Sequence, residues 1–317
     1  MRVVFMGTPD FAVGTLTALA RAGHEIVGVV SQPDKPKGRG KTLTPTPVKE
    51  EALRLGLPVY QPRRVREEAF VETLRSLHPD VIVVAAFGQI IPESILTLAP
   101  LGCINVHASL LPKYRGAAPI QWAVIDGEKE SGVTIMRMDA GLDTGDMIAK
   151  VTVPLDPEET GGSLFDKLSQ AGARLLVETL PSLENHTAVF EKQPQESPTA
   201  YAGMIRKEMG NLDWHLPAVR LERLIRGLNP WPSAYTFLGK KSLKLWRAQV
   251  LADAPGDTFA AGTVLQADAE GFLVQTGDGV LKILELQLEG KKRMEAEAFL
   301  RGCHVPVGTV LTQNRQE

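Results

Sequence analysis

The 317-residue sequence predicts an α/β domain built on a mostly parallel sheet, followed by a small antiparallel β-barrel. The length is typical of about two domains. Strand–helix–strand patterns fill the first part of the chain, and short strands separated by turns fill the last part. A polar, proline-containing stretch at 193–198 divides the two patterns. We therefore expect one domain over 1–190, a linker over 191–204 and a second domain over 205–317.

The first strand–helix–strand unit begins at the N-terminus. Arg2–Met6 is an apolar run that ends in a Gly-Thr-Pro turn. In this turn Thr8 is expected to cap a helix and Pro9 to take the first helical position. Gly23 can end that helix, and Ile26–Val30 is expected as the next strand. Two strands joined by a helix are the unit that builds a parallel sheet.

The same reasoning gives the remaining elements. Further apolar runs predict strands at Val81–Ala86, Ile104–His107 and Val133–Met138. Helical spacing predicts helices at Glu50–Leu55, Glu67–Leu77, Ile120–Ile125, Gly162–Leu180 and Leu216–Arg226. Short strands follow at Leu243–Val250, Thr263–Asp268, Phe272–Thr276 and Leu281–Gly290, with a hairpin turn at 277–279. Five or six such strands favour a small barrel over a sandwich.

The composition excludes several classes of protein. Apolar residues make up 44% and charged residues 23%, which excludes a disordered or fibrous chain. Cys103 and Cys303 are too few for a disulfide framework, and the six histidines never pair at i, i+4, so we expect no metal. The start of the chain lacks a signal-peptide core, and the run Val81–Phe87 is too short for a membrane span. We expect a cytoplasmic protein with no membrane partner.

A polar pair marks the end of the strand at Ile104–His107. Because side chains alternate along a strand, Asn105 and His107 share one face. Ligands of open α/β sheets bind at the carboxyl ends of the strands, so an amide and an imidazole are expected to project there together. The alternative is a histidine that is buried in the core with its hydrogen bonds satisfied there, next to an asparagine with a structural role. The Gly-Thr-Pro turn near the N-terminus lacks the G-x-G-x-x-G pattern, so no nicotinamide or ATP site is expected there.

A glycine-bounded acidic segment follows the strand Val133–Met138. Its spacing lacks the terminal glutamate of an EF-hand, and a solvated turn is the alternative reading of Asp139 and Asp146. Asp143 stands between two glycines, and a neighbouring strand can bring it beside His107. Asp, His and Asn without a nucleophilic Ser or Cys suit general acid–base transfer with no covalent intermediate.

A basic segment occupies Pro33–Lys41. Its prolines and glycines are expected to prevent a helix or strand, which leaves a flexible exposed loop. A solvated loop is one reading; the other is a positive patch on a net-acidic domain, whose natural partner is a phosphate backbone. The cations of the segment are Lys35, Lys37, Arg39 and Lys41, and Arg63, Arg64 and Arg66 would extend the patch.

These residues together resemble a known family, the formyltransferases that use 10-formyltetrahydrofolate. The resemblance rests on Asn105, His107 and Asp143 and on the segments 109–112 and 141–145. Longer stretches are similar to the members of this family that act on initiator methionyl-tRNA, namely 7–12, 38–41, 107–119 and 226–235. The likeness covers almost the whole chain, and its segments follow one another in the order found in the family. Asn105, His107 and Asp143 show no departure from the family's pattern.

The resemblance implies a Rossmann-like catalytic domain and a C-terminal OB-like barrel that binds tRNA. It implies transfer of a formyl group from 10-formyltetrahydrofolate to the α-amino group of methionine on initiator tRNA, for translation initiation. We expect Asn105 and His107 to donate hydrogen bonds to the formyl oxygen, and Asp143 to orient His107 and take the amine proton. The residue that protonates the departing folate nitrogen stays open, with His107 the first candidate.

The resemblance also implies which residues bind the two substrates. Phe87, Gly88, Gln89, Ile90 and Ile91 are implied to line the pterin pocket, and Ser109, Leu110, Leu111 and Pro112 to touch the folate. Lys35, Lys37, Arg39 and Lys41 are implied to reach the acceptor end of the tRNA, with Arg39 entering the stem.

Three alternatives remain at this point. A formyltransferase for a glycinamide nucleotide or a sugar amine would keep the three polar residues, but has no evident need for the basic segment or for 205–317. A folate-dependent hydrolase or sensor is the second, and a non-catalytic RNA-binding protein is the third. We expect a monomer, since no heptad pattern or long exposed apolar helix indicates assembly.

Overall fold

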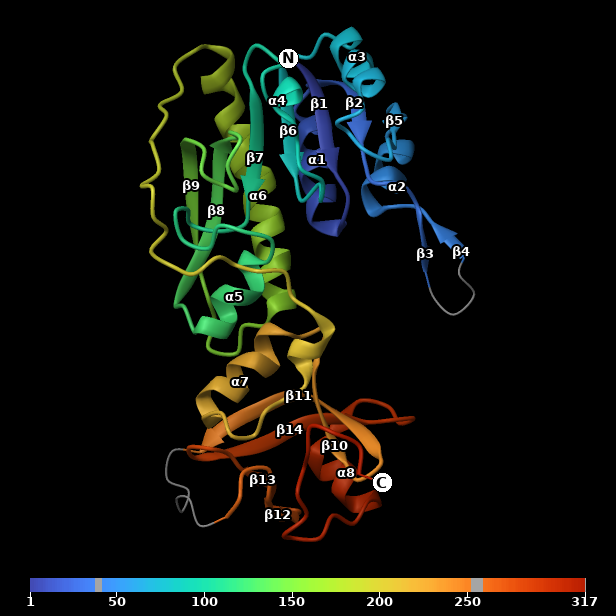
Figure 1. The fold of residues 1–317 in the computed structure, drawn as a ribbon, viewed down its shortest axis with the longest axis vertical. Coiled ribbons are helices and arrows are strands. Elements are labelled where there is room, and N and C mark those ends of the chain that lie inside the picture. The colour runs from blue at the N-terminus through green and yellow to red at the C-terminus, as the bar shows by residue number, and fades with distance from the viewer. Residues whose placement is uncertain (38–41, 252–258, 317) are drawn as a thin grey trace. The chain divides into compact units, whose positions relative to one another are not determined.

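The computed structural model describes residues 1–37, 42–251 and 259–316, which form two compact units (Figure 1). The first unit contains residues 1–119, 130–154 and 165–202. The second contains residues 120–129, 155–164 and the chain from Gly203 onward. Two short segments from within the expected first domain therefore group with the second unit, which a division made along the sequence does not anticipate.

A seven-stranded sheet, in the order β5-β2-β1-β6-β7-β8-β9, forms the centre of the first unit. The strands from β5 to β7 run parallel, and β8 and β9 are added antiparallel at one edge. The mostly parallel sheet expected from the sequence is confirmed. The strands are β1 Arg2–Gly7, β2 Glu25–Val30, β5 Val59–Tyr60, β6 Val81–Ala85, β7 Cys103–His107, β8 Glu130–Arg137 and β9 Met147–Pro154.

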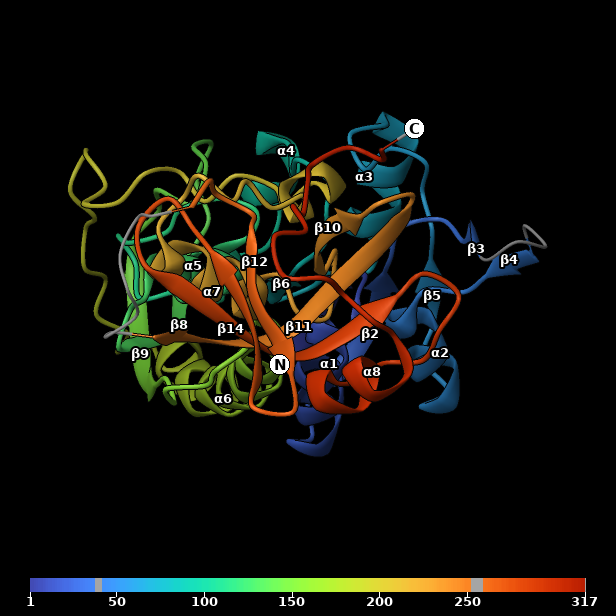
Figure 2. The ribbon, with the colours of Figure 1, turned by 90° about the horizontal axis from the view of Figure 1, so that it is seen from below.

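Helices cover both faces of this sheet, with α1, α2 and α6 on one side and α3 and α4 on the other (Figure 2). Alternate residues of β1 and β6, such as Met6 and Ile82, pack in one cluster with Leu74 of α3 and Ile95 of α4. Burial on both faces explains why strands such as β6 read as uninterrupted apolar runs. The helices are α1 Asp10–Arg21, α2 Pro47–Arg54, α3 Glu68–Ser76, α4 Glu93–Leu96 and α6 Gly161–Glu184.

The second unit contains a six-stranded antiparallel sheet. Its open edges are joined by the segment 308–312, because Val264 N donates to Thr309 O and Phe237 N donates to Thr312 O. The expected small antiparallel barrel is confirmed, with a core that includes Phe272 and Leu281. The elements are α5 Pro119–Asp126, η1 Lys207–Gly210, α7 Ala218–Gly227, β10 Ala234–Leu238, β11 Lys241–Leu251, β12 Val264–Asp268, β13 Gly271–Gln275, β14 Val280–Leu288, β15 Met294–Glu295 and α8 Ala296–Gly302.

Two local predictions are wrong. Pro9, not Thr8, is the N-cap of α1, because the Thr8 hydroxyl donates instead to the carbonyl of Phe87 at 2.8 Å. The basic segment is not free of strands, since β3 (Lys35–Lys37) pairs with β4 (Thr42–Thr44). An antiparallel ribbon leaves alternate residues without a ladder hydrogen bond, so a proline fits inside it.

The two cysteines differ in their surroundings, and neither forms a disulfide. Cys103, at the start of β7, is fully buried with its Sγ 3.6 Å from Met138 Sδ. This burial raises the pKa of the Cys103 thiol to about 12. Cys303 is half-buried. None of the described helices is both long and apolar enough to cross a membrane.

We expect Cys103 to resist alkylation by iodoacetamide at pH 8 while the protein is folded, because the side chain is buried and only a very small fraction of the thiol is ionised far below its raised pKa. In denaturant its pKa returns to the ordinary range and the thiol reacts. Mass spectrometry of the peptide that contains Cys103 measures both rates, and we expect them to differ by at least about 100-fold. Equal rates in folded and unfolded protein would contradict the burial.

Candidate active site

The strand order of the first unit reverses between β1 and β6, which is where open α/β sheets bind their ligands. Thr8, after β1, donates to the carbonyl of Phe87, after β6, at 2.8 Å. Gln32, after β2, donates from Nε2 to Phe87 O at 3.1 Å and to Gly88 O at 2.9 Å. Neighbouring loops therefore hold the start of the segment that was predicted to line the pterin pocket.

The rest of that segment presents one apolar side chain to the surface. Phe87 and Ile91 are buried, whereas Ile90 is 85% exposed. The Gln89 side chain points inward, since its Oε1 accepts a hydrogen bond from Val65 N at 3.1 Å. An exposed isoleucine between two anchored neighbours is well suited to contact a flat apolar ligand.

The predicted polar pair lies at the end of β7, with both side chains on one face. Asn105 is 9% exposed and His107 is 6% exposed. His107 Nε2 lies 3.1 Å from the carbonyl oxygen of Tyr114, which can only accept, so Nε2 carries the proton. Among the described residues the Asn105 side chain has no hydrogen-bond partner, so its amide group remains available to a ligand.

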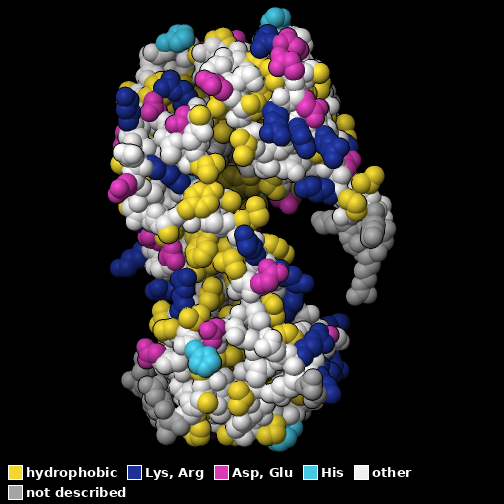
Figure 3. Space-filling model, viewed as in Figure 1, with side chains coloured by type: hydrophobic (Ala, Val, Ile, Leu, Met, Phe, Trp, Pro, Cys, Tyr) yellow, Lys and Arg dark blue, Asp and Glu magenta, His cyan; other side chains and the backbone are white. Residues whose placement is uncertain are grey.

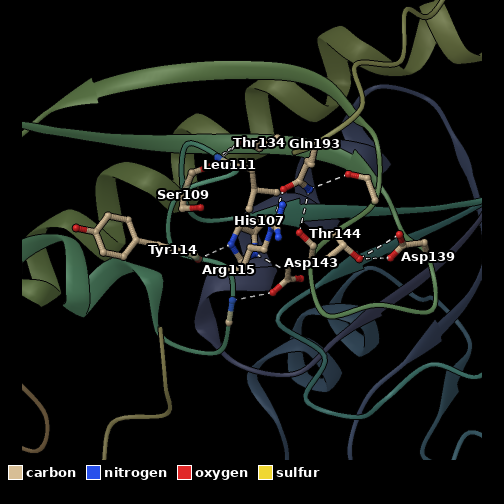
Figure 4. A network of polar contacts seen from close by, with 12 residues as sticks. His107, Ser109, Leu111, Tyr114, Arg115, Thr134, Asp139, Asp143, Thr144 and Gln193 are labelled. Carbon is tan, nitrogen blue, oxygen red and sulfur yellow. Dashed lines mark hydrogen bonds and ion pairs between the residues drawn. The ribbon is translucent and has the colours of Figure 1, made fainter. Parts of the chain in front are cut away.

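The segment between β8 and β9 brings Asp143 beside His107 (Figure 4). Asp143 Oδ1 lies 3.8 Å from His107 Nδ1, and Asp143 Oδ2 accepts a hydrogen bond from Gly116 N at 2.9 Å. The backbone of Asp143 has φ +56°, an unfavourable value for a residue with a side chain. The structure thus brings Asp143 close to both His107 and Gly116. The proximity of Asp143 to His107 was expected from the sequence.

The turn after β7 is held by hydrogen bonds inside the protein. The Ser109 hydroxyl donates to Lys113 O at 2.7 Å, and Leu111 N donates to Thr134 Oγ1 at 3.1 Å. Ser109 and Leu111 are buried, so their side chains shape the turn, whereas Leu110 and Pro112 border a cavity of about 300 Å³. The other lining residues of this cavity are Lys113, Tyr114, Glu130, Ser131 and Pro198.

The first part of the basic segment, up to residue 37, lies within the described residues. Asp34 is engaged by Lys49, whose Nζ lies 2.7 Å from Oδ2, and by Gln61, and these hydrogen bonds hold the pKa of Asp34 below its ordinary value. Lys35 is exposed and forms no ion pair with a described residue. Lys37 ends β3, whereas Arg39 and Lys41 lie outside the described residues.

Gln61 connects the chain just before three further arginines to the basic segment. Its Nε2 donates to Gln32 O at 2.9 Å and to Asp34 Oδ1 at 2.6 Å, which ties this part of the chain to the base of the basic segment. Figure 3 shows Lys and Arg side chains gathered over the region of β5 and α2 in the first unit. The arginines of this stretch, Arg63, Arg64 and Arg66, are exposed.

Two residues that contact the site were missed by the sequence analysis, Arg115 and Gln193. Gln193 lies in the stretch that its polar and proline-rich composition marked as a linker. The structure instead packs this stretch onto the loops around Asp143. No sequence pattern predicts that a side chain will donate hydrogen bonds to backbone carbonyls far away in the sequence. The described residues contain no group of three or more His, Cys, Asp or Glu side chains that could hold a metal ion.

Comparisons with known proteins show the family to which the sequence is related. The formyl transferase family model matches residues 1–180, and the formyl transferase C-terminal domain model matches residues 204–304. A methionyl-tRNA formyltransferase from Agathobacter rectalis is 59% identical over 98% of this chain and 100% of its own length. The methionyl-tRNA formyltransferase of Bacillus subtilis is 51% identical over 100% of this chain and 99% of its own length.

The fold is also shared with solved structures. A sugar 3N-formyl transferase, WlaRD, superposes with a TM-score of 0.65 at 18% identity, covering 92% of this chain and 99% of that chain. At this level of identity the likeness concerns the fold alone. The two family matches together span most of the sequence, and the relatives match it from end to end. The chain therefore belongs to the formyl transferase family.

Proposed function

We propose that the protein transfers the formyl group of 10-formyltetrahydrofolate to the α-amino group of methionine on initiator methionyl-tRNA, giving N-formylmethionyl-tRNA for translation initiation. The observation that carries this proposal is the end-to-end match, C-terminal domain included, to relatives that bear this activity in their names. A match confined to the first domain would have left a small-molecule substrate equally favoured.

The first unit supplies a suitable place for the folate donor. The sugar 3N-formyl transferase with the same fold was solved in the presence of 5-N-formyl-THF. In this chain we assign the pterin to the anchored segment Phe87–Ile91, where the exposed Ile90 offers an apolar surface. We assign further contacts to the turn Ser109–Pro112, through its backbone and through Leu110 and Pro112. The bound donor supplies an electrophilic formyl carbon.

Three side chains act on the transfer. The α-amine has an ordinary pKa of about 7.7–8.0, so a useful fraction is neutral near pH 7 and can attack the formyl carbon. A bond forms between the amine nitrogen and this carbon, the carbon–nitrogen bond to the folate breaks, and one proton passes from the amine to the folate nitrogen. Asn105 and His107 donate hydrogen bonds to the formyl oxygen as it gains negative charge, and one such donor is worth about 10²–10³ in rate.

The geometry of His107 decides which of its nitrogens takes part. Nε2 is engaged with the carbonyl of Tyr114, so Nδ1 is the nitrogen that faces the site. Asp143 lies beside Nδ1 and stabilises the positive charge of the imidazole when both nitrogens are protonated. Asp143 takes the amine proton, directly or through water. His107, protonated at both nitrogens, gives its Nδ1 proton to the departing folate nitrogen, and Asp143 then returns the amine proton to Nδ1, so that overall one proton moves from the amine to the folate. Positioned proton transfer contributes about 10²–10⁴ in rate.

We assign tRNA binding to two regions. The basic segment, with Lys35, Lys37, Arg39 and Lys41, contacts phosphates of the acceptor end, and the C-terminal barrel adds a second surface with a net charge of 15 − 13 = +2 over 205–317. The protein acts as a monomer in the cytoplasm, where charged initiator tRNA is found.

The direct test of the proposed function is transfer of a labelled formyl group from 10-formyltetrahydrofolate to charged initiator tRNA. Charged elongator tRNA is the control.

We expect His107→Ala and Asp143→Asn each to lower kcat by at least about 10³-fold, because each removes a group that acts in the transition state. Binding of tRNA should stay within about threefold, since neither side chain contacts phosphate. Single-turnover kinetics and a filter-binding assay measure the two effects. Near-normal turnover by both variants would rule out the proposed roles of His107 and Asp143.

We expect Arg39→Ala to lower kcat/KM for tRNA by about 10-fold or more and to leave folate binding unchanged, because the lost charge lies on the tRNA-binding segment. The variant should also show a shallower dependence of tRNA affinity on salt, by about one unit of the logarithmic slope. Titrations between 50 and 200 mM salt measure this slope. An unchanged kcat/KM and slope would refute the role of the segment.

A further inference from the structure

A buried guanidinium without an acidic partner lies next to the candidate site. Arg115 is 8% exposed, and within the described part of the chain it forms no ion pair. All three of its nitrogens donate to neutral oxygens of one short stretch. Nε donates to Gln193 Oε1 at 3.0 Å, Nη1 to Gln195 O at 3.1 Å and Nη2 to Pro194 O at 2.6 Å. Arg115 therefore fixes the chain at 193–195.

Gln193 connects this anchor to the loop that carries Asp143 (Figure 4). Its Nε2 donates to Asp143 O at 2.9 Å and to Gly145 O at 2.8 Å. The orientation of the amide is determined by its partners, because Arg115 can only donate and backbone carbonyls can only accept. The amide nitrogen of Gln193 thus donates both of its hydrogens to the Asp143 loop, and the amide oxygen accepts a hydrogen bond from Arg115.

The same anchor also holds the Asp143 side chain. Gly116, the residue after Arg115, donates its N–H to Asp143 Oδ2 at 2.9 Å. A side chain at this glycine would be strained, since its φ is +126° and a Cβ would lie 2.6 Å from Ala202 O. Arg115 and its neighbour therefore control both the backbone and the carboxylate of Asp143.

The stretch is fixed further along its length as well. Ser197 Oγ donates to Pro112 O at 2.8 Å, and Tyr114 N donates to Thr199 Oγ1 at 2.7 Å. Ala202 N donates to Arg115 O at 2.8 Å. Residues 193–202 therefore form a strap across the turn that follows β7, and the carbonyl of Tyr114 in this turn holds His107 Nε2.

We propose that Gln193 is a positioning residue for formyl transfer, which with Arg115 holds Asp143 beside His107, where Asp143 can take the proton of the attacking amine. The inference rests on the proposed function, because it assigns Asp143 a proton-transfer role. The φ of +56° places Asp143 in the left-handed region, which is less favourable than the right-handed region for a residue with a side chain, and the hydrogen bonds from Gln193 and Gly116 help to hold this conformation. A displacement of about 1 Å at a reacting group can lower the rate by about 10²-fold.

The test compares two glutamines of the strap. Gln193→Ala removes the link to the Asp143 loop, whereas Gln195→Ala is a matched control, because the Gln195 side chain is exposed and only its carbonyl meets Arg115. We expect Gln193→Ala to lower kcat by about 10–100-fold with KM for tRNA and folate within about twofold. Gln195→Ala should keep wild-type kcat, and the melting temperatures of both should match within about 3 °C.

A second variant separates the two sides of the amide. Gln193→Glu can still accept from Arg115 but can no longer donate to the carbonyls of Asp143 and Gly145, so it should lose kcat as Gln193→Ala does. Because Gln193 acts through Asp143, adding Gln193→Ala to Asp143→Asn should lower the single-turnover rate by less than about twofold. A purely structural role would lower it in both backgrounds equally.

The possible outcomes distinguish a failure of the positioning role of Gln193 from a failure of the proposed formyl-transfer function. An active wild-type enzyme whose kcat is unchanged by Gln193→Ala and Gln193→Glu would overturn the positioning role alone. Additive losses in the Asp143→Asn background would overturn it too. A wild-type protein that transfers no formyl group to charged initiator tRNA would overturn the proposed function and this inference with it.

Discussion

The proximity of Asp143 to His107 is the constraint on which the site depends. The two side chains come from segments 36 positions apart, and their 3.8 Å separation follows from restraints on both. His107 is held through Nε2 by the carbonyl of Tyr114, and Asp143 is held by Gly116 and Gln193. Every one of these restraints uses a backbone group, so the geometry of the His107–Asp143 pair depends on the path of the main chain.

The sheet provides the rigid frame for that path. Strands β1, β6 and β7 are buried on both faces, and their carboxyl ends present Thr8, Phe87 and the polar pair to one edge. Hydrogen bonds between successive loops then replace regular structure where the strands stop. The polar pair thus lies at the end of a strand and Asp143 on a loop, and both are supported by a packed core.

Much of this arrangement follows from the sequence, because burial leaves a periodic signal. The shared face of Asn105 and His107 is a consequence of strand alternation, and the run Val81–Ala85 is apolar because helices cover both of its faces. The edge strand β9 could not be predicted from an apolar pattern, because most of its side chains are half-buried or exposed. The role of Gln193 could not be predicted for another reason: two of its three partners are backbone carbonyls, which are the same in every residue, and the third, Arg115, is 78 positions away.

The interleaving of the two units limits how the chain can be dissected. Helix α5 belongs to the second unit, where Arg220 of α7 donates to the carbonyl of Ile125 at 2.7 Å. A fragment cut at the polar stretch after α6 would carry α5 away from α7, and it would also strip residues 193–202 from the turn that they strap. The two halves are therefore not interchangeable modules, and swapping a barrel between relatives requires α5 to be exchanged together with it.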